Sequence, residues 1–124
     1  MTKPTALVVD DFASMRSVVT EVLKRAGFTN ILQAANGQSA LARLLEHKNV
    51  GLVVSDWHMP EMDGLMLLRA IKDNPKLAHI PVLMITAEGQ RGNVLDAMQS
   101  GAVGYIVKPF TPAALQARLE QMFP

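Results

Sequence analysis

Five short apolar segments recur along the chain, and each is separated from the next by a segment whose apolar residues have helical spacing. The apolar segments comprise residues 6–9, 31–35, 50–55, 82–85 and 103–107. Continuous apolar runs of this length are typical of strands that are buried on both faces, as in a parallel sheet. Strands that alternate with helices require right-handed crossovers and helices on both faces. The pattern therefore predicts an α/β fold with a doubly wound, five-stranded parallel sheet.

The segments between the strands predict five helices, at about residues 15–26, 40–45, 64–73, 91–100 and 112–122. Asp11 or Ser14 is placed to cap the first helix, and Gly27 is placed to end it. Val18 in the first helix and Leu45 in the second belong to the apolar spacing, so we expect both on buried faces.

Composition limits the class of protein. A chain of 124 residues that is 49% hydrophobic has the size and the apolar content of one globular domain. Its net charge of +1 gives no basic footprint that would indicate a nucleic-acid partner. No apolar run approaches the roughly 18–20 residues of a membrane span, so we expect a cytoplasmic protein without membrane insertion. Because cysteine is absent, disulfides, a thiolate nucleophile and cysteine-ligated zinc are excluded.

Polar side chains stand where four of the predicted strands end, namely Asp10, Asp11, Asp56, Thr86 and Lys108. Since parallel strands end at the same edge of a sheet, these groups are expected to meet in one crevice. A single aspartate there is more often a turn-former, but turn propensity does not account for all four strand ends. Three neighbouring carboxylates are unfavourable without a cation, and Mg²⁺ prefers carboxylate oxygens. The set therefore predicts a magnesium site.

Four stretches carry a resemblance to a known family. They are V-V-D-D-F-A-S-M-R (8–16), V-S-D-W-H-M-P-E-M-D-G-L (54–65), P-V-L-M-I-T-A-E (81–88) and G-Y-I-V-K-P-F-T (104–111). By these stretches the chain resembles a response-regulator receiver domain, in particular the receivers of chemotaxis. The resemblance implies a flavodoxin-like (βα)5 fold with strand order 2-1-3-4-5 and one receiver domain over residues 1–124. It also implies a signalling protein and not an enzyme, apart from phosphoryl transfer to its own aspartate and self-dephosphorylation.

The resemblance assigns roles to the residues of the crevice. Asp56 would accept a phosphoryl group from a histidine kinase. Asp11 and Asp56 would bind Mg²⁺ directly, Asp10 largely through water, and the backbone carbonyl of His58 would complete the protein ligands. Lys108 would contact the phosphoryl oxygens, and its peptide bond to the following proline would be cis. These roles fit phosphoryl transfer, which depends on positioning and on charge neutralisation.

A switch and an output surface are also implied by the resemblance. Thr86 would contact the phosphoryl group and move toward it, and Tyr105 would turn inward, which is a population shift between two packings. The surface that changes would include Gly89, Arg91, Val94, Tyr105, Val107 and Arg118. The expected partner is a flagellar switch or pilus-motility protein. If the 124 residues are the whole protein, its output is contact with such a partner.

His58 departs from the family pattern, because chemotaxis relatives typically have asparagine at this position. We hypothesise that His58 and Glu88 approach each other across the phosphoryl group and alter its lifetime. Replacement His58→Asn is then expected to change the autodephosphorylation rate, and an unchanged rate would contradict the hypothesis. A phosphatase that reads the asparagine is not assured of binding a chain with His58.

Other classes of protein remain open from the sequence. A phosphotransferase or phosphatase of the haloacid-dehalogenase type also uses an aspartate nucleophile with Mg²⁺, but it usually carries an Asp-x-Asp pattern on the first strand, where this chain has Asp10-Asp11. A nucleotide-binding flavodoxin-like protein would need a glycine-rich loop at the same place. Within the receiver family, a phosphorelay shuttle and a phosphate sink are alternatives to motility control.

Overall fold

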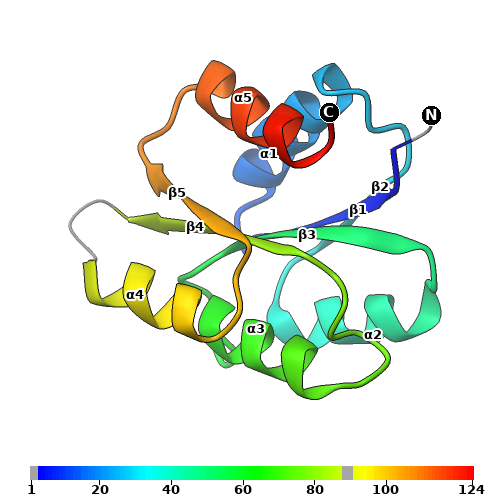
Figure 1. Ribbon diagram of the computed structural model, residues 1–124, viewed down its shortest axis with the longest axis vertical. Helices are drawn as coiled ribbons and strands as arrows, with labels where there is room; N and C mark the ends of the chain where they lie inside the picture. Colours follow the sequence, from blue (N-terminus) through cyan, green and yellow to red (C-terminus); the bar gives the residue numbers. More distant parts are fainter. Residues whose placement is uncertain (1–2, 88–90) are drawn as a thin grey trace.

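Five parallel strands form one sheet at the centre of the molecule, in the order β2-β1-β3-β4-β5 (Figure 1). The computed structural model describes residues 3–87 and 91–124. The strands are β1 (Thr5–Val9), β2 (Ile31–Ala34), β3 (Val50–Asp56), β4 (Val82–Ala87) and β5 (Gly104–Lys108). The predicted doubly wound sheet and the strand order implied by the resemblance are both confirmed.

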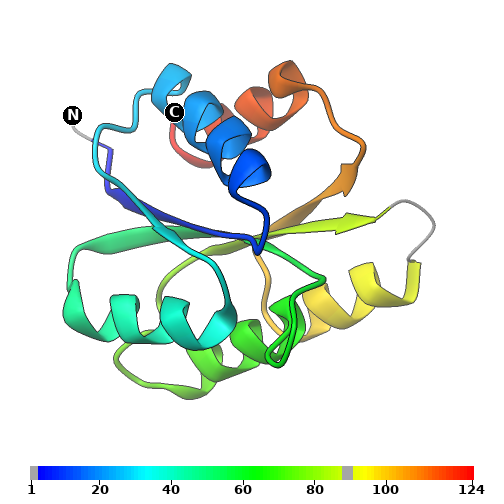
Figure 2. The same cartoon turned by 180° about the vertical axis from the view of Figure 1, so that it is seen from behind.

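Helices cover both faces of the sheet, as the two opposite views show (Figures 1 and 2). One face carries α1 (Ala13–Arg25) and α5 (Pro112–Met122). The other face carries α2 (Gly37–Glu46), α3 (Gly64–Asp73) and α4 (Arg91–Gln99). Within the described part of the chain, no helix is long and apolar enough to cross a bilayer.

Each face of the sheet has its own apolar core. Toward α1 and α5, the helical residues Val22, Leu23 and Leu115 pack with strand residues such as Leu52. Toward α2, α3 and α4, the core includes Leu44, Leu68, Ile71, Ala97, Val53 and Met84. Neighbouring residues along a strand therefore serve opposite cores, which explains why the strands are apolar without interruption.

Three helices begin at a side-chain cap of the ordinary kind. The side chains of Asn36, Asp63 and Thr111 accept hydrogen bonds from the third residue of α2, α3 and α5 respectively. At the other end, Gly27 and Gly101 follow α1 and α4 with φ of 100° and 103°, a region that favours glycine. The predicted ends of the first and fourth helices are thus confirmed.

The predicted cap of α1 is wrong. Phe12 occupies the N-cap position and makes no side-chain cap bond, so neither Asp11 nor Ser14 caps the helix. Asp10 instead accepts a hydrogen bond from the backbone N–H of Phe12, at 2.9 Å. The acidic pair therefore belongs to the crevice more than to the helix start.

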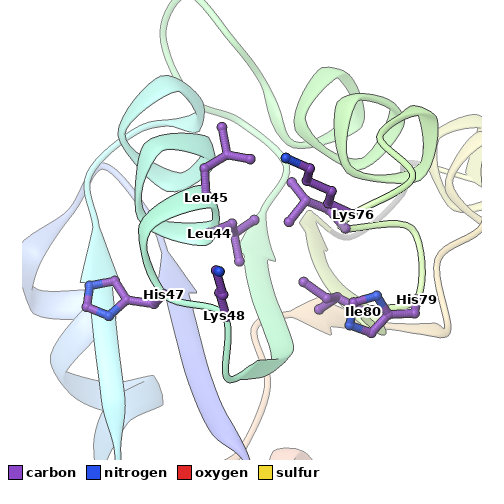
Figure 3. A pocket seen from close by; sticks show the side chains of 8 residues that line it. Leu44, Leu45, His47, Lys48, Lys76, His79 and Ile80 are labelled. Carbon is purple, nitrogen blue, oxygen red and sulfur yellow. The ribbon is translucent and has the colours of Figure 1, made fainter.

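Two apolar residues that were expected on buried helix faces are exposed. Val18 is 41% and Leu45 is 53% accessible to solvent. Both lie at the margin of their apolar stripe, beyond the area that the sheet covers. Leu45 faces the space between α2 and the connection from α3 to β4 (Figure 3).

Candidate functional site

Strand register brings the predicted site residues to one edge of the sheet. Val9 pairs with Ser55, Asp56 pairs with Ile85, and Ala87 pairs with Lys108. Asp56 is the last residue of β3, and its neighbour Trp57 still donates its N–H to the Ile85 carbonyl at 2.9 Å. The main chain at Asp56 is therefore held by the sheet ladder, which fixes where its side chain begins.

Three carboxylates converge at this edge. One oxygen from each of Asp10, Asp11 and Asp56 lies within 4.8 Å of the others. Asp10 and Asp56 are buried, with 2% and 3% of their surface exposed, and Asp11 is partly buried. Among the described residues, Asp10 Oδ2 and Asp11 Oδ1 are buried and lack a hydrogen-bond donor. Buried oxygens without donors are costly, so this donor set fits a hard divalent cation such as Mg²⁺.

The electrostatics of Asp10 agree with such a site. Burial raises the pKa of the Asp10 carboxyl above its usual value of 3.8, because removal from water penalises the charged form. The hydrogen bond from the Phe12 N–H opposes this rise, and the nearby charge of Asp56 adds to it. Without a cation, the site therefore disfavours the ionised form of Asp10.

Lys108 balances part of that charge. Its Nζ donates to Asp56 Oδ1 at 2.8 Å, and the two groups form an ion pair whose aspartate side chain is 5% exposed. The Lys108–Pro109 peptide bond is cis, as the resemblance implied. The ammonium therefore lies directly against the carboxylate that was expected to accept a phosphoryl group.

Thr86 completes the set of predicted groups at this edge. It is the next-to-last residue of β4 and is 1% exposed, and its Oγ1 has no hydrogen-bond partner among the described residues. Met84 pairs with Tyr105 and Thr86 pairs with Val107, so all four side chains share one face of the sheet. Tyr105 is partly buried against the core on that face. The expected switch residues are therefore diagonal neighbours on adjacent strands.

The connection from Asp56 to α3 is tightly constrained. A Cβ on Gly64 would lie 2.4 Å from the Asp56 carbonyl oxygen, so only glycine allows this approach. The Met62 N–H donates to the Pro60 carbonyl around Glu61, whose φ is 67°, and this pattern is that of a γ-turn. Trp57 is only 5% exposed and belongs to the core.

His58 is exposed, and its backbone carbonyl lies two residues after Asp56. The structure does not describe Glu88, so the hypothesis that it approaches His58 stays a prediction. Of the expected output surface, Gly89 and the side chain of Arg91 also lie outside the described residues.

The rest of the expected output surface lies on α4, β5 and α5. Val94 is partly buried, Val107 is 37% exposed, and Arg118 donates to the Tyr105 carbonyl at 3.3 Å. Sequence reasoning missed the exposed apolar residues Leu95, Met98 and Val103 on the same surface. The signal for α4 was present, because its apolar residues occur on more than one helix face.

Two apolar concavities flank the molecule outside the crevice. A groove of about 360 Å³ adjoins Lys108 and is lined by Met15, Val18, Lys108, Pro109 and Phe110. A pocket of about 500 Å³ lies between α2 and the α3–β4 connection, lined by leucine, isoleucine, lysine and histidine side chains (Figure 3). The second pocket contains no carboxylate and is at the opposite edge of the sheet from Asp56, so it is not the acidic site.

Comparison with known proteins agrees with this geometry. The response regulator receiver domain model matches residues 6–120. The chain is 44% identical to the chemotaxis protein CheY of Pseudomonas aeruginosa over 117 residues, which cover 94% of each chain. It is 46% identical to CheY-3 of Vibrio cholerae, over 94% of this chain and 89% of the relative.

Solved structures show the same likeness. The chemotaxis response regulator CheY4 of Vibrio cholerae superposes with a TM-score of 0.88 at 32% identity, over 98% of this chain and 100% of that one. A response regulator receiver protein from Pseudomonas putida gives 0.86 at 27% identity, over 98% of each chain. The sheet order, the acidic edge and these likenesses together show that the chain belongs to the response regulator receiver domain family.

Proposed function

We propose that this receiver is a response regulator that takes a phosphoryl group on Asp56 from a histidine kinase, with Mg²⁺ at the acidic edge. The observation that carries the proposal is the contact of 2.8 Å between Lys108 Nζ and Asp56 Oδ1, inside a cluster of three carboxylates. An ammonium in contact with a buried carboxylate can also stabilise the negative charge of a phosphoryl group bound there. The likeness to chemotaxis regulators favours control of motility as the output.

The residues of the site can carry out each part of the transfer. A carboxylate oxygen of Asp56 attacks the phosphorus of a phosphohistidine, the new P–O bond forms as the P–N bond breaks, and the imidazole that leaves takes a proton from solvent. Lys108 then pairs with a phosphoryl oxygen, and the Thr86 hydroxyl can donate to another. Mg²⁺ held by Asp10, Asp11, Asp56 and the His58 carbonyl would neutralise charge on the phosphoryl oxygens.

A way from the site to the output surface runs through Thr86. Among the residues that the structure describes, no group bonds its hydroxyl, and a phosphoryl oxygen would offer it a hydrogen bond. Movement of Thr86 toward that oxygen would free space beside Tyr105 on the same face of the sheet. The exposed Leu95, Met98, Val103 and Val107 suit the apolar side of a motility partner.

The phosphodonor needs a surface beside Asp56. The apolar groove lined by Met15, Val18 and Phe110 begins at Lys108, so a helix of the kinase that lies in it would bring its phosphohistidine to the site. The groove is lined by α1 and by the segment after β5, whereas Leu95 and Met98 are on α4 across the sheet, which supports a transfer step that is separate from partner binding through α4.

The test is phosphorylation by acetyl phosphate, followed by intact-protein mass spectrometry, with and without Mg²⁺. We expect one Mg²⁺-dependent phosphoryl group on the wild-type chain and none on Asp56→Asn. Asp63→Asn is a matched control, since Asp63 only caps α3 and its replacement keeps a capping side chain. Wild-type protein that takes no phosphoryl group from any donor would contradict the proposal.

Partner choice needs a second experiment. Binding of candidate flagellar-switch and pilus-motility proteins is compared with and without beryllofluoride, which imitates the phosphoryl group. We expect binding to increase with beryllofluoride and to require Tyr105. A phosphorelay shuttle would instead pass its phosphoryl group on to a histidine of another protein, and a sink would simply hydrolyse it.

A further inference from the structure

The main chain of Asp10 is held on both sides, although β2 ends beside it. The Asp10 N–H donates to the carbonyl of Ala34, which is the last residue of β2, at 3.2 Å. Because the strand ends there and the chain turns into α2, β2 has no following strand residue to donate to the Asp10 carbonyl. The guanidinium of Arg16 takes that place, with Nη1 donating to Asp10 O at 2.7 Å.

The guanidinium is itself held by a second contact. Its Nε donates to Gln33 Oε1 at 3.1 Å, and Gln33 Nε2 donates to Thr20 Oγ1 at 3.3 Å. Arg16 and Thr20 are one turn apart on α1, and Gln33 is on β2. A planar guanidinium with two bonds from its fork has a defined orientation. The three side chains thus tie α1 and β2 to the loop that begins at Asp10.

These contacts leave Asp10 one free buried oxygen. Its N–H and carbonyl are bonded as above, and Oδ1 accepts from the Phe12 N–H. Oδ2 is buried and has no donor among the described residues. A rotation of the main chain at Asp10 would move this oxygen relative to Asp56, and with it the geometry of the carboxylate cluster.

We propose that Arg16 is a positioning residue for the divalent-cation site, acting through the main chain of Asp10 and oriented by Gln33. The inference rests on the proposed Mg²⁺-dependent function. Arg16 does not touch the cation or the phosphoryl group; it fixes the loop that carries two of the carboxylates.

A role through charge and a role through positioning predict opposite effects of removing Arg16 on the Mg²⁺ affinity. Arg16 brings a positive charge near an acidic cluster, so if it acted only by its charge, its removal would strengthen Mg²⁺ binding. If Arg16 positions Asp10, its removal weakens binding, because the ligands then spend part of their time out of place. The sign of the change in Mg²⁺ affinity therefore distinguishes the two roles.

The experiment is a Mg²⁺ titration of the full chain, followed by the backbone amide NMR signals of residues 10–12. We expect Arg16→Met to raise the Mg²⁺ Kd on the order of tenfold, as is usual when a group that orients a metal ligand is lost. Arg16→Lys, which keeps the charge and one donor, is expected to restore part of the affinity. Arg25→Met removes an exposed charge from the last turn of the same helix, and we expect its Kd to match the wild type.

A rate measurement separates positioning from damage to the transfer step. With acetyl phosphate as donor, Arg16→Met is expected to need a higher Mg²⁺ concentration for half-maximal phosphorylation but to approach the wild-type rate at saturating Mg²⁺.

An unchanged or lowered Kd for Arg16→Met would overturn the inference. If Arg16→Met does not fold by circular dichroism, Gln33→Ala decides, since it frees the guanidinium without removing it. A Gln33→Ala Kd equal to that of the wild type would then overturn the inference.

The proposed function and this inference fail in different ways. Wild-type protein that binds no Mg²⁺ would overturn both. A second outcome is that the wild-type protein binds Mg²⁺ and takes up a phosphoryl group, and that Arg16→Met is phosphorylated at the same Mg²⁺ concentration. That result would overturn only the role of Arg16.

Discussion

At the scale of single residues, the charge of Asp10 lowers the stability of the acidic edge in the absence of a cation. Asp10 is buried next to another carboxylate, and its pKa is raised mainly by burial, so the charged form is penalised in the folded protein. Its stabilising contribution is complete below the unfolded pKa and is lost as the pH rises through the folded pKa. At neutral pH, Asp10 therefore lowers the stability of the metal-free protein.

Replacement Asp10→Asn is expected to raise the free energy of unfolding of the metal-free protein at neutral pH and to flatten its decline above about pH 4. The physical reason is that the amide has a similar shape but no charge to bury. The measurement is urea denaturation in EDTA across pH 4 to 7, with the difference between the two proteins isolating Asp10 from the other carboxylates.

Added Mg²⁺ should reverse the order of stability, because a ligand that binds only the folded state stabilises it, and Asp10→Asn binds Mg²⁺ more weakly. Asp73→Asn is a suitable control, since this carboxylate is exposed and distant from the crevice. An Asp10→Asn variant that is less stable than the wild type in EDTA would contradict the account.

At the scale of elements, the connection from β3 to α3 combines a close backbone approach with a strained turn. Gly64 permits the close approach to the Asp56 carbonyl, and Asp63 caps α3 at 2.8 Å from the Met66 N–H. Between Asp56 and Asp63, Glu61 adopts a positive φ of 67° that a residue with a Cβ rarely takes. The turn thus holds backbone strain in the segment that follows Asp56.

Replacement Glu61→Gly is expected to stabilise the protein by about 0.5–1 kcal/mol. Glycine removes a strain of about 1–2 kcal/mol at positive φ, and part of this gain is offset by the greater flexibility of the unfolded chain. Glu61→Ala removes the same exposed side chain but keeps the Cβ, so it should give no such gain. The check is the free energy of unfolding of both variants; equal stability of the glycine and alanine variants would exclude backbone strain as the cause.

At the scale of the whole molecule, one face of the sheet carries both Thr86 of the acidic edge and Tyr105 of β5. Thr86 and Tyr105 lie on the face that is covered by α2, α3 and α4, whereas α1 and α5 cover the other face (Figures 1 and 2). A movement of the Thr86 side chain would therefore alter the packing of β5 and α4 before that of α1 and α5. The apolar groove lined by Met15 and Val18 of α1 lies toward the opposite face.

Replacement Thr86→Val should separate stability from signalling. Valine has nearly the shape of threonine but lacks its buried hydroxyl, which has no hydrogen-bond partner within residues 3–87 and 91–124. The free energy of unfolding of the unphosphorylated protein is therefore expected to rise by about 1 kcal/mol. The phosphorylated protein loses a hydrogen bond to the phosphoryl group and should no longer shift Tyr105. Thermal unfolding measures the first effect, and the beryllofluoride-induced NMR shifts of Tyr105 and Val107 measure the second.

Thr86→Ser is the control, because it keeps the hydroxyl and should retain the shifts of Tyr105. Full beryllofluoride-induced shifts in the valine variant would show that Tyr105 responds by another route.

Much of this protein could be predicted from local patterns in its sequence. The apolar runs predicted the five strands, the helical spacing predicted the helices, and Gly27 marked the end of the first helix, because these signals depend only on nearby residues. The site residues could be grouped because parallel strands end at one edge, so Asp10, Asp56 and Lys108 had to approach one another. The strand order came from resemblance, since periodicity does not record which strands are neighbours.

Only the tertiary structure decided which polar atoms are satisfied and how the loops are held. That Asp11 does not cap α1, that Arg16 bonds the Asp10 carbonyl, and that Leu45 is exposed all depend on distant segments. The burial of the Thr86 hydroxyl, which has no partner in the described part of the chain, and the raised pKa of Asp10 also depend on other elements. The sequence by itself therefore determined which residues form the site, and the packing of α1, β2 and β3 determined how those residues are positioned and charged. The physical reason is that hydrogen bonding and desolvation depend on distances between segments that a local pattern does not contain.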